Sequence, residues 1–274
     1  MSYELIDSGN GMKLERFGEF TLLRPCAQAV WKPSLAQKVW DGADATFTRD
    51  KENRWIYKKP IPKQWQIHWE GLHFKIAPTD FGHVGIFPEH ASLWKWMKEK
   101  IQSSPRKLEV LNLFAYSGGA TLAAAAAGAK VCHLDASKGM VAWARENANL
   151  NQMGTAPIRW IIDDVIKFLG REIRRNQRYD GIILDPPSFG RGAQGEVFKI
   201  EDHLGQILEL CKNVLTDNPS FVIFSAHTPG FTPIVMRHLL GQVMPAGKME
   251  TGEMVITGKN TLDLPCGSYA RWFT

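Results

Sequence analysis

Two segments constrain the fold of this chain more than any other feature. Residues 110–119 read Val-Leu-Asn-Leu-Phe-Ala-Tyr-Ser-Gly-Gly, and residues 182–189 read Ile-Ile-Leu-Asp-Pro-Pro-Ser-Phe. The first is an apolar run that leads into a glycine turn, which predicts a buried strand followed by a helix. The second is an apolar run that ends in an acid, two prolines and an aromatic residue. Both are typical of a parallel sheet, in which ligands bind at the carboxyl ends of the strands.

The chain alternates predicted strands and helices from residue 108 onward, at the spacing of a parallel sheet covered by helices. The predicted strands are 108–113, 130–135, 158–162, 181–185 and 220–226. The predicted helices are 120–127, 138–150, 165–175, 202–215 and 232–240, preceded by a helix over 89–101. Residues 248–257 and 267–273 are expected to form an antiparallel closing pair, so the sheet would be mixed at one edge.

The N-terminal part differs in character, because it is rich in tryptophan and in turn signals. Residues 64–69 and 72–77 alternate around Gly71 and predict two short strands joined by a tight turn. We therefore expect a small β-rich subdomain over residues 1–85 and a Rossmann-like α/β domain over residues 86–274. Tryptophan in such a subdomain is expected to fill its core, since a small β unit needs large side chains to bury enough area.

Composition narrows the class of protein further. The net charge of +5 and the pI near 9.0 favour a polyanionic partner, although an ordinary basic enzyme fits as well. The four cysteines are scattered, which indicates reduced, buried thiols and neither a disulfide framework nor a metal site. The chain shows no basic start followed by an apolar stretch. We therefore expect a cytoplasmic protein without membrane association.

Acids and glycines follow three successive predicted strands, where a ligand of a parallel sheet would bind. Gly118 and Gly119 permit a sharp turn, and Asp135 is placed to accept hydrogen bonds from two ribose hydroxyls. Asp163 and Asp164 end the third strand; Asp164 is favoured as acceptor for an adenine amino group, and it also suits a helix N-cap. The chain contains no Gly-x-Gly-x-x-Gly, which counts against a dinucleotide. These features favour S-adenosylmethionine, which carries no phosphate.

The segment after the fourth strand suits a planar nitrogen acceptor. A carboxylate and a fixed carbonyl that accept hydrogens from a delocalised nitrogen can localise its lone pair for methyl transfer. Asp185 and the carbonyl of Pro186 are the candidates, Pro187 stiffens the segment, and Phe189 offers a flat face for stacking a base. The alternative is a rigid strand exit with a core phenylalanine.

The chain resembles the bacterial large-subunit (23S) ribosomal RNA methyltransferases and their relatives of unassigned substrate. The resemblance covers about residues 80–227, and the segments that carry it are Gly85–Glu89, Leu111–Gly119, Asp135–Lys138, Trp143–Asn147, Asp164 and Asp185–Phe189. It implies a class I methyltransferase fold and S-adenosylmethionine as methyl donor. The cofactor residues it implies are Phe87, Phe114, Ala115, Tyr116, Ser117, Gly118, Gly119, Asp135, Ala136, Ser137, Asp163, Asp164 and Asp185.

Two departures from that family bear on the substrate. Members that make 5-methylcytosine carry a nucleophilic cysteine after the fifth strand, where this chain has Phe-Ser-Ala-His-Thr at residues 224–228. Cys132 and Cys211 fall in a predicted strand and helix, and Cys266 is a remote candidate, so covalent carbon methylation is disfavoured. Residues 1–75 also look too short and too different to be the RNA-binding domain of some members. His227 fits either a structural role or a general base.

The leading hypothesis is a methyltransferase that acts on a nucleobase nitrogen in RNA, with ribosomal RNA as the implied partner and no metal. A protein amide or a small molecule would suit the same acid, proline and aromatic pattern. Two further hypotheses are a non-catalytic S-adenosylmethionine-binding protein and, more remotely, a dehydrogenase. The sequence leaves open the target nucleotide, the methylated atom and the oligomeric state.

Overall fold

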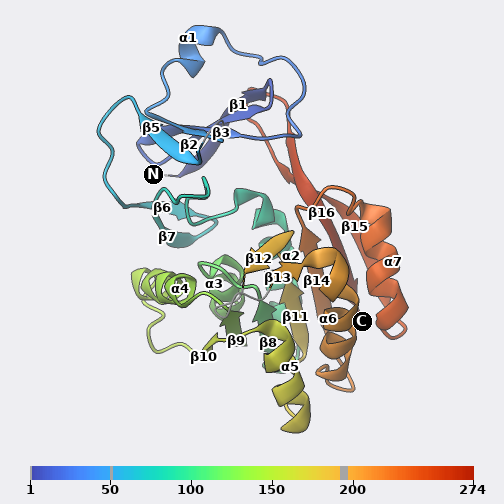
Figure 1. Ribbon diagram of the computed structural model, residues 1–274. Helices are drawn as coiled ribbons and strands as arrows, with labels where there is room; N and C mark the ends of the chain where they lie inside the picture. Colours follow the sequence, from blue (N-terminus) through green and yellow to red (C-terminus); the bar gives the residue numbers. More distant parts are fainter. Residues whose placement is uncertain (1, 50–51, 192–196) are drawn as a thin grey trace. The chain divides into compact units, whose positions relative to one another are not determined.

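The computed structural model describes residues 2–49, 52–191 and 197–274 (Figure 1). The chain divides into two compact units. The first comprises Met1–Glu89 with Val255–Cys266, and the second comprises His90–Met254 with Gly267–Thr274. Residues 255–266 thus belong with the N-terminal unit although they follow the Rossmann-like part in sequence. The division into domains 1–85 and 86–274 stays a prediction.

The second unit is built on a seven-stranded sheet of order β10-β9-β8-β11-β14-β16-β15. Its first five strands pair in parallel and β14 pairs antiparallel with β16, which confirms a mostly parallel sheet with an antiparallel edge. The strands are β8 (Glu109–Leu113), β9 (Lys130–Asp135), β10 (Ile158–Ile162), β11 (Gly181–Leu184), β14 (Phe221–Ala226), β15 (Lys248–Ile256) and β16 (Leu264–Phe273).

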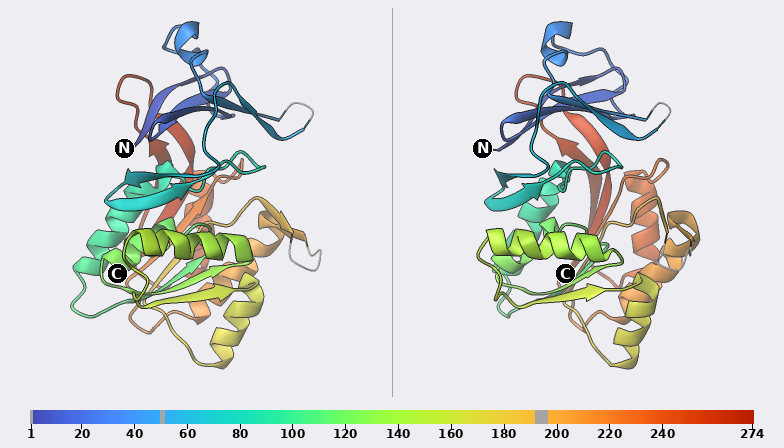
Figure 2. Two further views of the ribbon diagram at one scale, coloured as in Figure 1. Left: turned by 90° about the vertical axis from the view of Figure 1, so that its left-hand side faces the viewer. Right: turned by 60° about the vertical axis from the view of Figure 1, so that its left-hand side comes forward.

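Helices cover both faces of this sheet (Figure 2). They are α2 (Ala91–Gln102), α3 (Gly119–Ala126), α4 (Lys138–Leu150), α5 (Val165–Arg174), α6 (Ile200–Asn213) and α7 (Pro233–Val243). All were predicted, with ends that differ by up to three residues. A short hairpin of β12 (Phe189–Arg191) and β13 (Val197–Lys199), which the sequence pattern did not predict, precedes α6.

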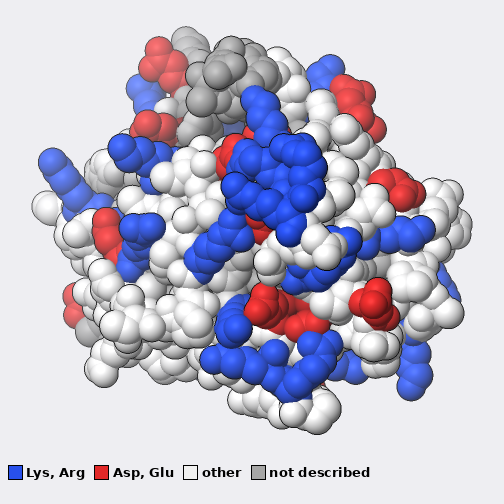
Figure 3. Space-filling model, turned by 90° about the horizontal axis from the view of Figure 1, so that it is seen from below, with Lys and Arg blue, Asp and Glu red and all other residues white. Residues whose placement is uncertain are grey.

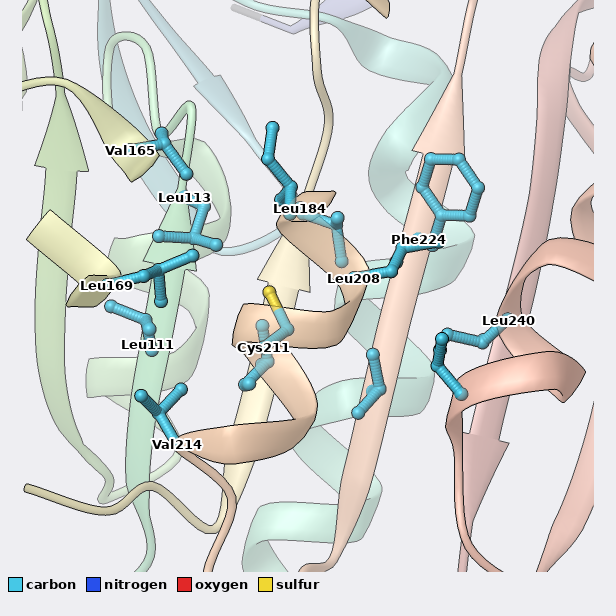
Figure 4. Packing of buried hydrophobic residues seen from close by; sticks show 14 of the residues in the cluster. Leu111, Leu113, Val165, Leu169, Leu184, Leu208, Cys211, Val214, Phe224 and Leu240 are labelled. Atoms are coloured by element: carbon cyan, nitrogen blue, oxygen red, sulfur yellow. The ribbon is translucent and has the colours of Figure 1, made fainter. Parts of the chain in front are cut away.

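One core cluster of the second unit lies between the sheet and helices α5, α6 and α7 (Figure 4). Fully buried side chains from the strands meet those of α6, among them Leu111, Leu184, Phe224, Leu208 and Cys211. Burying each large apolar side chain contributes roughly 1.5–3 kcal/mol relative to exposure. The central strands are therefore held rigidly, and this rigidity fixes the positions of the loops that leave their carboxyl ends.

The first unit is β-rich, as predicted. Its five-stranded sheet runs in sequence order over β1 (Tyr3–Gly9), β2 (Met12–Phe17), β3 (Phe20–Pro25), β4 (Ala45–Thr48) and β5 (Arg54–Tyr57), with a short helix α1 (Gln37–Trp40). The predicted pair of short strands is the antiparallel hairpin β6 (Trp65–Trp69) and β7 (Leu72–Ile76), turned by Gly71 at φ +81°. The indole nitrogens of Trp31, Trp40, Trp55 and Trp65 all donate hydrogen bonds within this unit. These tryptophans therefore serve its packing.

All four cysteines are free and buried, as expected. Over the ranges that the structure describes, no helix combines the length and the apolar character needed to cross a bilayer.

Candidate functional site

The turn between β8 and α3 has an unusual backbone. Phe114 and Tyr116 adopt positive φ angles of 54° and 50°, and Gly118 follows at 90°. Positive φ is uncommon for residues other than glycine and clusters at ligand-binding loops. The amide of Ala115 donates to the carbonyl of Leu134 at 3.0 Å, which ties the turn to the end of β9. The predicted glycine turn is thus present, with two strained positions that its sequence did not reveal.

The two glycines of this turn lie against neighbouring helices. A Cβ atom on Gly119 would stand 2.5 Å from Cζ2 of Trp94 in α2, and one on Gly118 would stand 3.0 Å from Cβ of Ala144 in α4. The turn therefore has room only for glycine at both positions. Trp94 was not predicted to support this turn, because helical periodicity does not show which partner a side chain meets.

Replacing Gly119 with alanine is expected to lower the free energy of unfolding by about 1–3 kcal/mol, because overpacking against the buried Trp94 forces side chains to move. Urea unfolding measures this. Gly205→Ala is the matched control, since Gly205 lies in α6 with no atom within 4 Å of the added Cβ. That variant is expected to gain about 0.5–1 kcal/mol from helix propensity. Equal stability of the two variants would contradict the packing argument.

Asp135 joins the ends of β8 and β9. Its Oδ2 accepts a hydrogen bond from the amide of Tyr116 at 2.8 Å, and its Oδ1 accepts one from the amide of Ser137 at 2.8 Å. Burial raises the pKa of Asp135 above its ordinary value, and these two hydrogen bonds oppose the rise. Ser137 in turn caps α4 by accepting from the amide of Met140. The carboxylate is therefore fixed in orientation at the sheet edge.

The remaining cofactor candidates of this unit lie around the same edge. Asp164 caps α5 through a hydrogen bond from the amide of Lys167 at 2.9 Å, as predicted, and Asp163 pairs with Arg171. Ser117 is buried and its carbonyl accepts from Nδ2 of Asn147 at 2.9 Å, whereas Ala136 is exposed. Asn147 belongs to the segment that carried the family resemblance, although its contact with the loop was not foreseen.

Phe87, the one cofactor candidate outside this unit, belongs to the first unit. Its ring contacts that of His83, with centroids 5.2 Å apart. Its role toward a cofactor stays a prediction.

Asp185 follows β11 and lies among three polar side chains. Ser225 of the adjacent strand β14 donates a hydrogen bond to its Oδ1 at 2.8 Å. His90, at the start of α2, places Nε2 3.5 Å from Oδ2, and His227, directly after β14, places Nδ1 3.6 Å from Oδ1. Burial alone would raise the pKa of Asp185, but the two imidazoles and Ser225 lower it to about 2. The side chain is therefore an oriented carboxylate at neutral pH.

The residues after Asp185 change rapidly from buried to exposed. Pro186 is buried, Pro187 is exposed, and Phe189 is 52% exposed. The hydroxyls of Ser188 and Thr228 are hydrogen-bonded at 2.7 Å, which holds the segment to the loop after β14. The alternative interpretation of Phe189 as a core residue is therefore wrong.

The thiols do not suit nucleophilic chemistry. Burial raises the pKa of Cys132 to about 11 and that of Cys211 to about 12, and it also raises the pKa values of Cys26 and Cys266. A thiol must ionise to attack a ring carbon, so thiols with raised pKa values are inert at neutral pH. This agrees with the absence of a cysteine at residues 224–228.

Comparison with known proteins identifies the class. The family described as S-adenosylmethionine-dependent methyltransferase matches residues 21–229. A methyltransferase of that kind from Agrobacterium tumefaciens is 41% identical, with a TM-score of 0.94 over all of this chain and 90% of its own. A putative methyltransferase solved with S-adenosylhomocysteine, SMU.776, has the same fold at 21% identity and a TM-score of 0.75, covering 96% of this chain and 71% of its own. This chain belongs to the S-adenosylmethionine-dependent methyltransferases.

Among curated proteins, the chain is similar to the ribosomal RNA large subunit methyltransferase K/L of Pseudoalteromonas translucida. The two are 32% identical over 164 residues, which is 59% of this chain and 22% of that protein. The chain thus spans only about a fifth of the length of this relative. The family match and the Agrobacterium structure confirm the class expected from the sequence, an S-adenosylmethionine-dependent methyltransferase.

Proposed function

We propose that the three loops at the carboxyl edge of β8, β9 and β10 bind S-adenosylmethionine, which supplies the methyl group. Each oxygen of Asp135 uses one lone pair on a backbone amide, so a second lone pair on each remains for the two ribose hydroxyls. Asp164 uses Oδ1 as a helix cap, which leaves Oδ2 for the adenine amino group. The residues present therefore fit the cofactor.

We propose further that the acceptor is a nucleobase nitrogen in RNA, with ribosomal RNA as the leading candidate. One observation carries this proposal: Ser225 holds the Asp185 carboxylate in place, and the half-exposed Phe189 follows four residues further along the chain. A base that stacks on Phe189 presents its edge nitrogen toward a fixed acceptor. The name of the curated relative, a ribosomal RNA methyltransferase, supports the choice of RNA.

The chemistry follows from where the charges lie. A nitrogen attached to an aromatic ring is a weak nucleophile because its lone pair is delocalised. Asp185 and the Pro186 carbonyl accept its hydrogens, which concentrates the lone pair on nitrogen and stabilises the positive charge that develops during transfer. Pro186 and Pro187 restrict the backbone, so these acceptors need little reorganisation.

A basic surface gives the protein a second feature suited to RNA. Lys and Arg side chains gather on the face seen from below in Figure 3, toward which the C-terminal end of α5 points in Figure 1. The last turn of α5 contains Arg171 and Arg174, and Arg174 and Arg175 are exposed. Part of this charge is neutralised within the unit, because Arg171 pairs with Asp163 and Arg175 with Glu172. We propose that the rest contributes to phosphate attraction without defining the target base.

The proposal is tested by methyl transfer from labelled S-adenosylmethionine to total RNA from a strain that lacks the protein, followed by digestion to nucleosides. Label in an amino-methylated or ring-nitrogen-methylated base is the expected result. Label in 5-methylcytosine would contradict the nitrogen assignment. Label in protein and none in RNA would contradict the RNA assignment and favour a protein amide.

Replacing Phe189 with alanine is expected to raise KM for RNA about 5- to 150-fold, because stacking of one base is worth roughly 1–3 kcal/mol. The affinity for S-adenosylmethionine should remain that of the wild type. Steady-state kinetics at varied RNA concentration measure the effect. Phe189→Tyr, which keeps a flat face, is the matched variant and should retain most of the affinity; equal loss in both variants would argue against stacking.

Cofactor affinity is expected to weaken as the pH falls into the acid range. Only the carboxylate of Asp135 can accept from both ribose hydroxyls, and the pKa of this group is raised by burial. Protonation therefore begins at a higher pH than for an ordinary aspartate, and binding is lost in that direction. Calorimetric titration with S-adenosylmethionine across a pH series measures this. An affinity that stays constant through the acid range would contradict the role of Asp135.

A further inference from the structure

Three side chains that are far apart in the sequence converge at the acceptor end of the site. His90 comes from the start of α2, Asp185 from the end of β11, and His227 from the end of β14. One ligand atom from each lies within 4.8 Å of the other two. All three are partly exposed, with 14%, 22% and 31% of their respective side chains accessible. They therefore form one cluster at the border of the buried interior, in which Nε2 of His90 is itself buried.

The distances in the cluster distinguish two kinds of interaction. The separations between carboxylate oxygens and imidazole nitrogens are 3.5 Å for His90 and 3.6 Å for His227. An N–H···O hydrogen bond has a typical length of about 2.7–3.2 Å, which is shorter than both. Two ligand atoms bound to one tetrahedral zinc ion at about 2.0–2.2 Å stand roughly 3.3–3.6 Å apart. Both separations are close to those of ligands that share an ion. They involve different oxygens, Oδ2 for His90 and Oδ1 for His227, so binding requires the carboxylate to turn or to use both oxygens.

We propose that His90, Asp185 and His227 form a binding site for a divalent ion of the zinc class. Imidazole nitrogens and a carboxylate oxygen are ligands that suit such ions. Three protein ligands would leave a fourth position open to water or another ligand, as in exchangeable zinc sites.

A second observation supports this site. The hydroxyl of Ser225 donates to Oδ1 of Asp185 at 2.8 Å, which orients the carboxylate between the two rings. Hydrogen bonds of this kind commonly orient metal ligands and tune their affinity. The sequence predicted no metal because that expectation rested on local spacing, whereas these ligands come together only through the parallel pairing of β11 and β14.

The inference shares Asp185 with the proposed function but does not require an RNA acceptor. An ion held by the Asp185 carboxylate would occupy the group that we assign to the acceptor nitrogen. Bound ion and acceptor should therefore exclude each other. With RNA as acceptor, zinc is expected to slow methyl transfer while S-adenosylmethionine still binds.

The test is calorimetric titration of the untagged full chain with Zn²⁺, supported by visible absorption after titration with Co²⁺. We expect one saturable site and a tetrahedral Co²⁺ spectrum without thiolate bands. His90→Ala and His227→Ala should each weaken Zn²⁺ binding at least about tenfold, and Ser225→Ala about 10- to 100-fold. His238→Ala is the matched control, because His238 is exposed on α7 outside the cluster, and its affinity should equal that of the wild type.

Absence of saturable Zn²⁺ binding by the wild type would overturn the proposal. So would wild-type affinity in the double variant His90→Ala/His227→Ala. Retained binding of S-adenosylmethionine by each variant shows that the unit is folded. Ion binding is measured directly. A lack of Zn²⁺ binding would therefore not contradict the RNA methylation proposal, and a lack of RNA methylation would not contradict the ion-binding proposal.

Discussion

Replacing Asp185 with alanine is expected to lower kcat about 10²- to 10³-fold, which corresponds to about 2.7–4 kcal/mol of transition-state stabilisation. The variant loses an oriented carboxylate that Ser225 holds at the end of β11. The acceptor nitrogen then has no fixed anion to receive its hydrogens. The affinity for S-adenosylmethionine should change much less than kcat. Single-turnover methyl transfer to RNA at saturating cofactor measures the effect.

Asp217→Ala is the matched control for this experiment. Asp217 is an exposed aspartate between α6 and β14, at the opposite end of that strand from Ser225. Its removal costs the chain the same charge and should leave kcat unchanged. An Asp185→Ala variant with wild-type kcat would show that the carboxylate takes no part in transfer, and the catalytic assignment would be wrong.

Replacing Asp135 with alanine is expected to raise the Kd for S-adenosylmethionine by at least about 10²-fold. Two hydrogen bonds from ribose hydroxyls to a charged acceptor contribute about 1.5–3 kcal/mol each, and the lower bound of their sum is about 3 kcal/mol. The variant also loses the acceptors for the amides of Tyr116 and Ser137, so the turn after β8 is held less firmly. Calorimetric titration with the cofactor measures the change.

The activities of the Asp135→Ala and Asp185→Ala variants should respond differently to a higher concentration of S-adenosylmethionine. Activity of Asp135→Ala should recover substantially at high S-adenosylmethionine, because binding is what the variant lacks. Activity of Asp185→Ala should remain low at any concentration. The same response from both variants would favour the cofactor-binding role that the family resemblance also implies for Asp185 over its role toward the acceptor.

The parallel sheet could be predicted because its signals are local. Apolar runs such as the one at residues 181–184, separated by helical periodicity, specify the order of elements along the chain. The predicted helices differ from the observed ones only at their ends, where capping decides. Helix α7, for example, begins at Pro233 after the Thr232 cap.

The N-terminal sheet and the cluster of His90, Asp185 and His227 could not be predicted in the same detail. Strands β3 and β4 pair in parallel across a long connection, which no local pattern encodes. The approach of His90 and His227 to Asp185 likewise depends on where α2 begins and on the neighbouring places of β11 and β14 in the sheet. The strained backbone at Phe114 and Tyr116 depends on its tertiary support, including the hydrogen bond to Asp135. The roles of the cofactor and acceptor residues stay predictions.

Methylation of an RNA nitrogen with the help of Asp185 is best tested by mass spectrometry of RNA nucleosides. The RNA comes from a strain that lacks the protein and is complemented with either the wild type or Asp185→Ala at equal expression. We expect a nitrogen-methylated base that is present with the wild type and absent with the variant. Identical nucleoside profiles in the two strains would contradict this assignment.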